Sequence, residues 1–345
     1  MKKNLNIEVM RIISMLLIVL GHICSSFIPL GTNGSDIFRI VTPKFIFFIT
    51  FHVNIFLLIS GYCGIRTLRN ILKIWKLLFS YLVLIASLNV IVSLGTFDYS
   101  LILLPFSRCP WWFMQIYIFL AMIAPVLLEP YLKQCSIRDT LKLIGLLIII
   151  DVYFGHICHL RTVNNGGYDL LHFITIYMIG AFLRKIDIKS ICIGKFRFNF
   201  KCWMIVFLVL MMLKVINYIV INKIGYKDYY DEYNHPFNIF ISVCFFCMIM
   251  NIKFTNMKLI NISSSVIGVY LLQEHPLIKE KLIQLFDFLI KYCNEVLGIE
   301  ILFTLFFVVS IFIVAIIIDK IRIFIFNNVE RVITGCSLYG QKDKD

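Results

Sequence analysis

Long apolar stretches alternate with short polar segments from one end of the chain to the other. The first stretch, residues 7–28, reads IEVMRIISMLLIVLGHICSSFI, and similar stretches recur along the chain. Runs of about 18 or more apolar residues are long enough to cross the hydrocarbon layer of a membrane as helices. The pattern therefore predicts an all-α polytopic membrane protein with about ten transmembrane helices, at about residues 7–28, 43–65, 77–95, 111–128, 141–158, 170–183, 202–222, 237–252, 259–275 and 299–318.

The charges are distributed unevenly between the two ends of these helices. The chain has 33 Lys and Arg residues against 20 Asp and Glu, a formal net charge of +13. Of the basic residues, 22 lie in loops on the side of both termini and 9 in the opposite loops, while Arg11 and Lys214 fall within helices. Cytoplasmic loops are enriched in Lys and Arg. We therefore expect both termini, and the basic segment 66–76, to be cytoplasmic.

The composition supports a membrane protein and excludes other classes. The chain is 60% hydrophobic and 15% charged, with a mean hydropathy of +0.88, which lies outside the range of soluble globular proteins. The basic residues are spread over many loops rather than clustered on one face, so no nucleic acid is expected as a partner. Cys244 and Cys247 lie in an apolar stretch without a histidine nearby. No metal site is predicted from them.

Two segments near the C-terminal end differ from the spanning pattern. Residues 277–297 alternate charged and apolar side chains at helical spacing, which predicts an amphipathic helix at the membrane surface. We expect residues 1–322 to form one transmembrane domain and residues 323–345 to form a short cytoplasmic tail, with no separate soluble domain.

The first apolar stretch carries an arginine and a histidine, Arg11 and His22, eleven positions apart. In a helix this spacing puts both side chains on one face, about 16 Å apart along the axis. Glu8, one turn before Arg11, could orient it through an i,i+3 pair. If Arg11 lies at one headgroup level, His22 lies near the middle of a hydrocarbon layer about 30 Å thick. An ionisable residue at that depth indicates a functional site. The alternative is a neutral histidine that is hydrogen-bonded between helices.

Other polar residues lie within the predicted helices. His52, in the second helix, is expected at a depth similar to that of His22, and the two could meet if the first two helices pack together. A histidine bonded to a backbone carbonyl is the alternative for His52. Asp151, in the run LLIIIDVYFGH, is a candidate either for a site or for structural pairing. Ser60 and Gly61 could allow two helices to approach closely.

The arrangement of Arg, ten residues and then His in the first helix resembles the acyltransferase-3 family. The resemblance continues, in the order of the family, in FHVNIFLLISGYCGIRTLR (51–69), PWWF (110–113), FITIYMIGAFLRK (173–185) and SSSVIGVYLLQEHP (263–276). Members of this family are bacterial integral-membrane acyltransferases, many of which O-acetylate cell-surface polysaccharides. The resemblance covers most of the chain and implies that residues 1–322 form a transmembrane acyltransferase domain in the plasma membrane of a bacterial cell.

The resemblance implies roles for the ionisable residues of the first two helices. His22 would be catalytic, either as a general base for an acceptor hydroxyl or as a covalent acyl carrier, and His52 is a second catalytic candidate. Arg11, Arg66 and Arg69 would hold the phosphates of acetyl-CoA, because planar guanidinium groups bind two oxygens at once. The alternative for Arg66 and Arg69 is that cytoplasmic loops are basic in any case.

The acceptor side is less strongly indicated. Trp111 and Trp112 are substrate-binding candidates because tryptophan stacks on sugar rings, although a pair at a helix start is also typical of the membrane interface. The acidic and aromatic residues 229–232 could likewise contact a glycan. The chain departs from the family at Gln273, where relatives often have a histidine, and His275 follows two residues later. Any role of that family histidine is therefore in doubt here.

These observations lead to a specific expectation of function. We expect an enzyme that moves an acyl group, most simply acetyl, from cytoplasmic acetyl-CoA to a hydroxyl of a surface polysaccharide or its lipid-linked precursor, within the lipid bilayer and without a metal. The alternative is a transporter or flippase for a lipid-linked glycan or a small anion, which would usually show repeated, broken helix pairs. A polysaccharide polymerase, normally with a large extracellular loop, is a further alternative.

Overall fold

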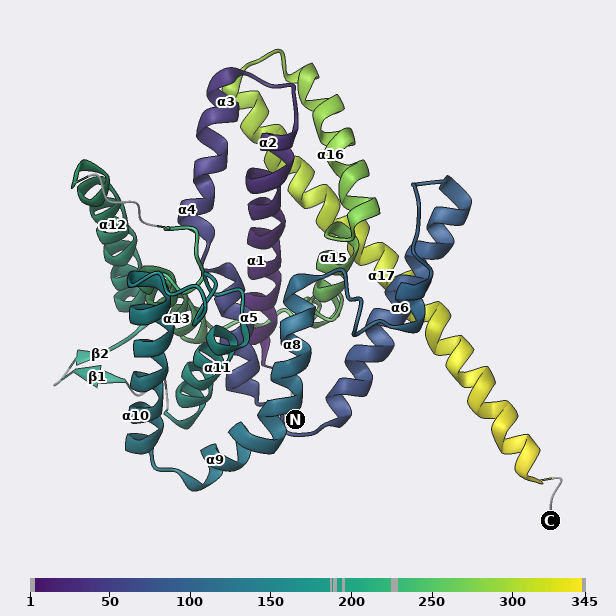
Figure 1. The fold of residues 1–345 in the computed structure, drawn as a ribbon, viewed down its shortest axis with the longest axis horizontal. Coiled ribbons are helices and arrows are strands. Elements are labelled where there is room, and N and C mark those ends of the chain that lie inside the picture. Colours follow the sequence, from purple (N-terminus) through teal and green to yellow (C-terminus); the bar gives the residue numbers. More distant parts are fainter. Residues whose placement is uncertain (1–3, 187, 189–190, 194–195, 225–228, 343–345) are drawn as a thin grey trace.

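The computed structural model describes residues 4–186, 188, 191–193, 196–224 and 229–342. Within these residues the protein is a bundle of helices with one small antiparallel hairpin at its side (Figure 1). In chain order the α-helices and strands are α1 (Leu5–His22), α2 (Ile28–Leu30), α3 (Asp36–Val41), α4 (Ile46–Ile49), α5 (His52–Cys63), α6 (Arg69–Val92), α7 (Ser100–Leu103), α8 (Trp112–Ile123), α9 (Glu129–Gln134), α10 (Ile137–Ile148), α11 (Leu170–Lys185), β1 (Cys192–Ile193), β2 (Phe196–Arg197), α12 (Phe200–Ile224), α13 (Pro236–Met250), α14 (Leu259–Ser263), α15 (Val266–Gln273), α16 (Pro276–Ile290) and α17 (Leu297–Lys342).

Short π- or 3₁₀-helical segments join several of these helices into longer ones. By length and composition, seven segments among the described residues could cross a membrane: Leu5–Leu30, Asp36–Cys63, Arg69–Val92, Trp112–Gln134, Ile137–Ile157, Phe200–Ile221 and Leu297–Arg331. Pro236–Met250 and Leu259–Gln273 are shorter apolar helices. The protein is thus a helical, multi-pass membrane protein, while ten spans and the direction of insertion remain predictions.

Two helices extend further than the sequence predicts. The basic segment 66–76 was expected to be a loop, but α6 begins at Arg69, because this segment is rich in Leu, Lys and Arg and contains neither Gly nor Pro. The last helix was expected at 299–318, but α17 has 46 residues and continues to Lys342. The expected tail is therefore helical as far as it is described.

The predicted helix at 259–275 is broken. It is interrupted at Ser264 and Ser265, between α14 and α15. α15 then ends at Gln273, close to the expected end at 275, and α16 starts at Pro276. Proline has no N–H to continue a helical ladder and disfavours the helical conformation in the residue before it. The amphipathic segment then forms α16, which packs against α15 and α17 and joins the start of α17 at the upper end of Figure 1.

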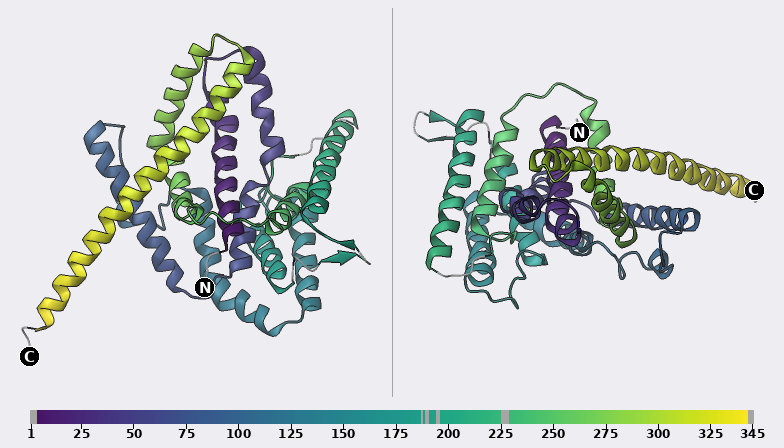
Figure 2. Two further views of the ribbon diagram at one scale, coloured as in Figure 1. Left: turned by 180° about the vertical axis from the view of Figure 1, so that it is seen from behind. Right: turned by 90° about the horizontal axis from the view of Figure 1, so that it is seen from above.

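α1 lies in the middle of the bundle and contacts α5, α13, α14, α15 and α17 (Figures 1 and 2). α5 in turn packs closely against α11. A Cβ atom at Gly61 would overlap the backbone carbonyl of Tyr177, and a Cβ at Gly180 would overlap that of Leu58. The prediction that Gly61 permits close helix packing is confirmed. Glycine is needed on both helices because the two backbones touch.

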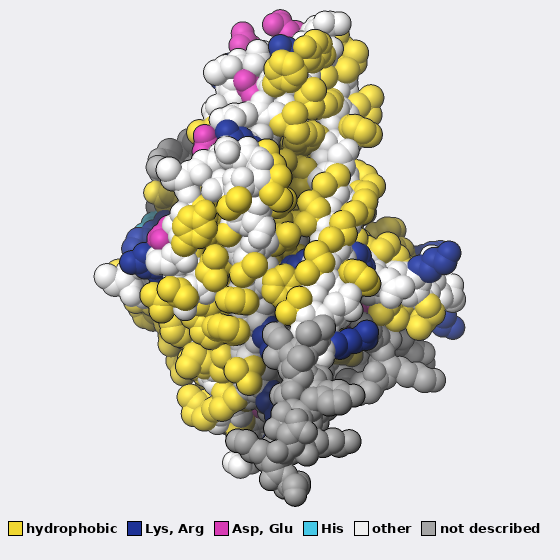
Figure 3. Space-filling view, turned by 90° about the vertical axis from the view of Figure 1, so that its right-hand side faces the viewer, with side chains coloured by type: hydrophobic (Ala, Val, Ile, Leu, Met, Phe, Trp, Pro, Cys, Tyr) yellow, Lys and Arg dark blue, Asp and Glu magenta, His cyan; other side chains and the backbone are white. Residues whose placement is uncertain are grey.

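The outer surface fits a lipid environment. Hydrophobic side chains cover most of the side of the molecule that carries α17 (Figure 3). On α17 alone Leu302, Phe306, Ile313 and Ile317 are more than half exposed. A contiguous apolar surface of this kind is not stable against water and marks contact with a membrane or a partner.

Candidate functional site

His22 is the last residue of α1 and is followed by a π-helical segment, Ile23–Phe27. Segments of this kind frequently occur at functional sites. The His22 side chain is 17% exposed, and its Nδ1 lies 3.3 Å from Oε1 of Gln273 and 3.1 Å from Oε1 of Glu274. Gln273 and Glu274 belong to the break between α15 and α16. Because the Gln273 amide oxygen is the hydrogen-bond partner of Nδ1, this nitrogen carries the proton of the neutral ring, and Nε2 is the basic nitrogen.

The His22 ring lines a narrow cavity of about 20 Å³. Its wall is mostly apolar and aromatic, consisting of Met15, Ile18, Val53, Phe56, Trp112, Phe113, Tyr233, Ile267 and Tyr270. A cavity of this size holds about one water-sized group. The basic nitrogen of His22 therefore belongs to a ring set in a confined, largely dry site.

A second cavity of about 290 Å³ contains Arg11. Polar groups of Ser60, Tyr117, Ser263 and Ser264 also line it. The two cavities share Phe56, Phe113 and Ile267 as wall residues and are therefore neighbours. Arg11 and His22 thus line two adjacent cavities, in keeping with their predicted common helix face.

Arg11 is oriented by a carboxylate one turn earlier in α1. Its Nη1 donates to both oxygens of Glu8 at 3.1 Å, and Glu8 also accepts a hydrogen bond from Ser263 of α14. The Arg11 side chain is 34% exposed while that of Glu8 is almost buried. The expected pair of Glu8 and Arg11 is confirmed. The pair fixes one nitrogen of the guanidinium and leaves the remainder directed at the cavity end of the helix.

Arg66 and Arg69 lie at the same end of the molecule but do not line the Arg11 cavity. Both are exposed in the turn from α5 to α6, and Ile74 and Leu77 of α6 form part of the cavity wall instead. The three arginines therefore do not converge on one cavity.

A polar network fixes this turn. Gly64 has φ of +78°, which favours glycine. The next residue, Ile65, donates its N–H to the Tyr177 hydroxyl at 2.9 Å, and Tyr177 donates to Glu129 at 2.6 Å. Arg184 of α11 completes the network with bonds of 3.0 and 3.1 Å to Glu129. Arg184 and Glu129 were not identified from the sequence as positioning residues, because their partners are remote in the chain.

His52 lies next to α1 but outside the His22 cavity. It is 2% exposed, and its Nδ1 bonds the carbonyl of Ile49, one turn earlier. Its ring is close to Gly21, where a Cβ would lie 3.6 Å from the His52 Cε1. The structure thus brings His52 close to His22 and also shows the backbone carbonyl bond that was the alternative interpretation.

The two neighbouring tryptophans have different environments. Trp111 is 1% exposed and donates its indole N–H to the carbonyl of Leu271 at 2.9 Å, which is a packing role. Trp112 faces the His22 cavity and stacks with Tyr233 at a centroid distance of 5.8 Å. Tyr168 lies 4.6 Å from Trp112 and is 44% exposed, so it links this aromatic wall to the surface. Tyr168 and Tyr233 were missed, although the aromatic loop around 229–232 was noted.

Asp151 belongs to a buried polar network rather than to the His22 cavity. Its Oδ2 lies 2.8 Å from Nδ1 of His172, whose Nε2 lies 2.9 Å from Oδ1 of Asn54. Asn54 donates its amide N–H to the carbonyl of Tyr233 at 3.0 Å. This is the structural pairing that was left open for Asp151. The network holds the Tyr233 loop against α5 and so positions the aromatic wall indirectly.

Glu232, in the same loop, is bound by two cationic or potentially cationic groups. His156 Nδ1 lies 2.8 Å and Arg161 Nη2 2.5 Å from its carboxylate. Burial alone would raise the pKa of Glu232, but the hydrogen bonds from His156 and Arg161 outweigh it and hold the pKa below its usual value. Glu232 thus anchors the loop, and Asp231 is the exposed acid of the 229–232 segment.

No group of three or more His, Cys, Asp or Glu side chains within the described part of the chain could hold a metal ion. The arrangement instead offers a basic imidazole in a dry cavity, an oriented arginine about three helical turns away and an aromatic wall leading to the surface. These groups suit proton transfer beside a ligand that has an anionic end.

Comparison with known proteins identifies one match. A family described as an acyltransferase domain matches residues 4–320, essentially the whole chain. Neither curated proteins nor solved structures yield a match.

Proposed function

The chain belongs to the acyltransferase-3 family, so it is a membrane acyltransferase, and on this basis we propose that it transfers an acetyl group from cytoplasmic acetyl-CoA to a hydroxyl of a surface polysaccharide or its lipid-linked precursor. The observation that carries the proposal is that Arg11 and His22 line two neighbouring cavities that share three wall residues. In the proposal a path connects the two cavities, with the donor phosphates at the Arg11 end and the reacting groups at the His22 end.

The donor enters from the Arg11 end in this proposal. Coenzyme A has phosphates at one end and a thioester at the other, and the Arg11 guanidinium suits the phosphates. About 16 Å of α1 separate Arg11 from His22, a distance suited to the pantetheine arm. Arg66 and Arg69, exposed at the same end, would extend the anion-binding surface toward solvent.

The acceptor reaches His22 from the side of Trp112, Tyr168 and Tyr233. Aromatic faces suit the apolar faces of sugar rings, and Tyr168 connects the wall to the surface. The acceptor hydroxyl would donate its proton to Nε2 of His22 while its oxygen attacks the thioester carbonyl. The C–S bond then breaks, and the coenzyme A thiolate takes the proton back from His22, so that an ester and a free thiol result.

Ten membrane spans with cytoplasmic termini complete the proposal, because this direction places Arg11 and the α5–α6 turn on the side where acetyl-CoA is made. Seven longer segments and two shorter apolar helices supply nine candidates, and α11, with 16 residues, would be the tenth span. The bacterial plasma membrane is the location that such a donor and acceptor require.

The test separates binding from transfer. His22→Ala should leave acetyl-CoA affinity in the purified protein nearly unchanged while acetate released from surface glycan by mild base falls to background, because His22 acts in the transition state. Arg11→Ala should weaken acetyl-CoA binding by about ten- to a hundredfold, since a charge-assisted bond is worth roughly 1.5–3 kcal/mol. Arg138→Ala, an exposed arginine of α10, is the matched control.

Two results would contradict the proposal. Normal glycan acetylation in a well-expressed His22→Ala protein would remove His22 from the chemistry. If the wild-type protein binds no acetyl-CoA, that result would favour a different acyl donor or the alternative function as a transporter. Acetylated peptide containing His22, trapped by rapid denaturation, would support a covalent acyl carrier in place of a general base.

A further inference from the structure

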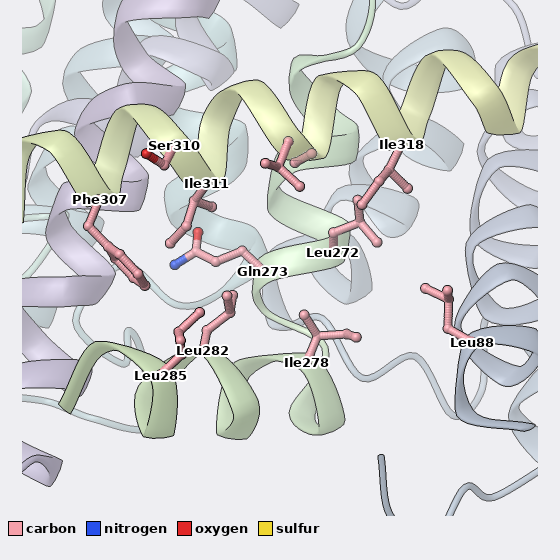
Figure 4. A pocket seen from close by; sticks show the side chains of 12 residues that line it. Leu88, Leu272, Gln273, Ile278, Leu282, Leu285, Phe307, Ser310, Ile311 and Ile318 are labelled. Carbon is pink, nitrogen blue, oxygen red and sulfur yellow. The ribbon is translucent and has the colours of Figure 1, made fainter. Parts of the chain in front are cut away.

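The two faces of α15 border different spaces. Leu272 and Gln273 are turned into an apolar pocket of about 270 Å³ between α15, α16 and α17 (Figure 4). Among the described residues, none lines both this pocket and the His22 cavity. From its other face α15 contributes Ile267 and Tyr270 to the wall of the His22 cavity. Tyr270 is therefore the polar side chain that α15 brings to this cavity.

The hydroxyl of Tyr270 acts only as an acceptor, as far as the chain is described. Tyr270 is 4% exposed, and its oxygen accepts the backbone N–H of Phe113 at 3.3 Å. A tyrosine hydroxyl can also donate its own proton, but within the described part of the chain no acceptor for that proton is in place. Leaving a buried donor without an acceptor costs free energy. A ligand in the cavity could supply the missing acceptor.

The N–H that binds this hydroxyl belongs to the start of α8. Phe113 is the second residue of α8, and the first N–H groups of a helix have no acceptor inside it. A hydroxyl that accepts a hydrogen bond becomes a stronger donor itself. The positive end of the helix dipole also favours negative charge nearby. Both effects make the Tyr270 hydroxyl a suitable donor to an oxygen on which negative charge develops.

The same hydroxyl is close to the proposed reacting centre. The ring centroids of Tyr270 and His22 are 6.4 Å apart, and both rings line a cavity that holds about one water-sized group. Phe113, which binds the Tyr270 hydroxyl, also lines the Arg11 cavity. A thioester that comes from the Arg11 side would pass Phe113 before it meets His22. Its carbonyl would then be beside Tyr270.

We propose that Tyr270 is a catalytic residue, whose hydroxyl donates a hydrogen bond to the carbonyl oxygen of the bound thioester and stabilises the oxyanion that forms there. The inference rests on the proposed acyl transfer. The acceptor oxygen adds to the carbonyl carbon, its proton goes to Nε2 of His22, and the π-electron pair moves to the carbonyl oxygen. Tyr270 keeps its own proton. The electron pair then returns, the C–S bond breaks, and the thiolate takes the proton from His22.

The test follows the thioester carbonyl of acetyl-CoA bound to purified protein in lipid nanodiscs. A ¹³C label at this carbonyl separates its infrared band from those of the protein. Tyr270→Phe removes the hydroxyl and keeps the ring, so the bound carbonyl should absorb at higher frequency than in the wild type, because a hydrogen bond weakens the C=O bond. Acetyl-CoA affinity should fall by no more than about tenfold. Acetylation of glycan in isolated membranes should slow by about 100- to 1000-fold.

Further variants separate donation by Tyr270 from a structural role. 3-Fluorotyrosine in place of Tyr270 keeps the bond from Phe113 and makes the hydroxyl a stronger donor, so the carbonyl band should move to lower frequency. Trp112→Phe and Tyr233→Phe remove the other hydrogen-bond donors that line the cavity with His22, and should leave this frequency unchanged. The matched control is Tyr99→Phe, because Tyr99 is 56% exposed and does not line the cavity. It should leave both frequency and transfer at wild-type values.

The outcomes distinguish this inference from the function on which it rests. Equal carbonyl frequencies in the wild type, Tyr270→Phe and the fluorotyrosine protein would overturn the role of Tyr270, while acetyl-CoA binding still supports acetyl transfer. A shift in Trp112→Phe or Tyr233→Phe in place of Tyr270→Phe would assign the hydrogen bond to another donor and overturn it as well. A wild type that binds no acetyl-CoA would contradict the proposed function itself.

Discussion

At the scale of single residues, the site depends on which groups face each nitrogen of His22. Glu274 lies 3.1 Å from Nδ1 and is also paired with Lys279 at 3.0 Å. A carboxylate beside Nδ1 orients the ring and stabilises the imidazolium that forms when Nε2 takes a proton. Lys279 in turn holds the carboxylate in place. Glu274 is therefore a positioning residue, which acts on the substrate only through His22.

The role of Glu274 can be tested with the isosteric change Glu274→Gln. We expect kcat for acetyl transfer to fall by about 10- to 100-fold, as for other second-layer partners of histidine, while the KM for acetyl-CoA stays near the wild-type value. The matched control is Glu280→Gln, an exposed glutamate on α16. A purely structural role would lower expression and thermal stability instead of kcat, and a wild-type kcat in Glu274→Gln would refute the positioning role.

The sequence predicts residue roles well where one helix fixes their spacing. Arg11 and His22 lie on one face of α1, and the pair of Glu8 and Arg11 follows from an i,i+3 spacing, so each was predictable. Glu274 was missed because its contact with His22 depends on a helix break far along the chain. Gln273, the residue before it, is 251 positions from His22. Trp111 and Trp112 differ only in which way they point, and hydropathy patterns do not record that.

At the scale of elements, the loop after α2 is held by carboxylates of α16 and α17. Asp287 accepts hydrogen bonds from the backbone N–H groups of Thr32 and Asn33 at 2.6 and 2.9 Å. Glu300, which is fully buried, accepts from the N–H of Ser35 at 2.6 Å and from its hydroxyl at 2.5 Å. These hydrogen bonds therefore attach the start of α3 to α16 and α17.

This attachment should depend on pH in a defined direction. Burial alone would raise the pKa of Asp287, but the hydrogen bonds from Asn33 and Thr32 outweigh it and lower the pKa. A lowered pKa in the folded protein means that the stabilisation is complete above the usual aspartate range and is lost as pH falls through the lowered value. A nitroxide on Ile37→Cys, an exposed position of α3, should remain immobile until the pH is below that range.

The same probe gives the control for this prediction. Asp287→Asn should make the label more mobile at neutral pH, because an amide does not supply two equivalent charged acceptors. Glu280→Gln, an exposed change on the same helix, should leave both the mobility and its pH dependence as in the wild type. Label mobility that is independent of pH in the wild type would show that Asp287 does not hold the loop.

The existence of helices was more predictable than their ends. Long apolar runs show where a chain can span a membrane, so the main helices lie where expected. α6 begins before its apolar run because the residues ahead of that run are helix formers without Gly or Pro. α17 continues past its apolar run to Lys342, and its sequence contains no proline that would end it. The break before Pro276 agrees with the predicted end of one helix at 275 and the start of an amphipathic helix at 277, whereas the interruption between α14 and α15 lies inside an apolar run and was not predicted.

At the scale of the whole molecule, the fold places at one end several of the segments that the charge distribution predicts to be cytoplasmic. Both termini, the α5–α6 turn and α9 lie at the lower end of Figure 1. The loops assigned to this side carry 22 Lys and Arg residues against 9 on the other. Cytoplasmic loops of membrane proteins carry an excess of Lys and Arg of this kind. The end of the path that contains Arg11 is therefore expected to face the cytoplasm and its acetyl-CoA.

Labelling with a membrane-impermeant thiol reagent on intact cells tests this direction. In a background with all eleven native cysteines replaced, Asn165→Cys should be labelled and Arg138→Cys should not, because the two exposed positions lie at opposite ends of α10 and its π-helical continuation. Lys195, another position predicted to be cytoplasmic, lies outside the described residues. Permeabilised cells supply the control, since both cysteines should then react. The reverse pattern on intact cells would place Arg11 on the outside, where acetyl-CoA is absent. The proposed donor would then be wrong, and the cavities would have to bind a different acyl donor.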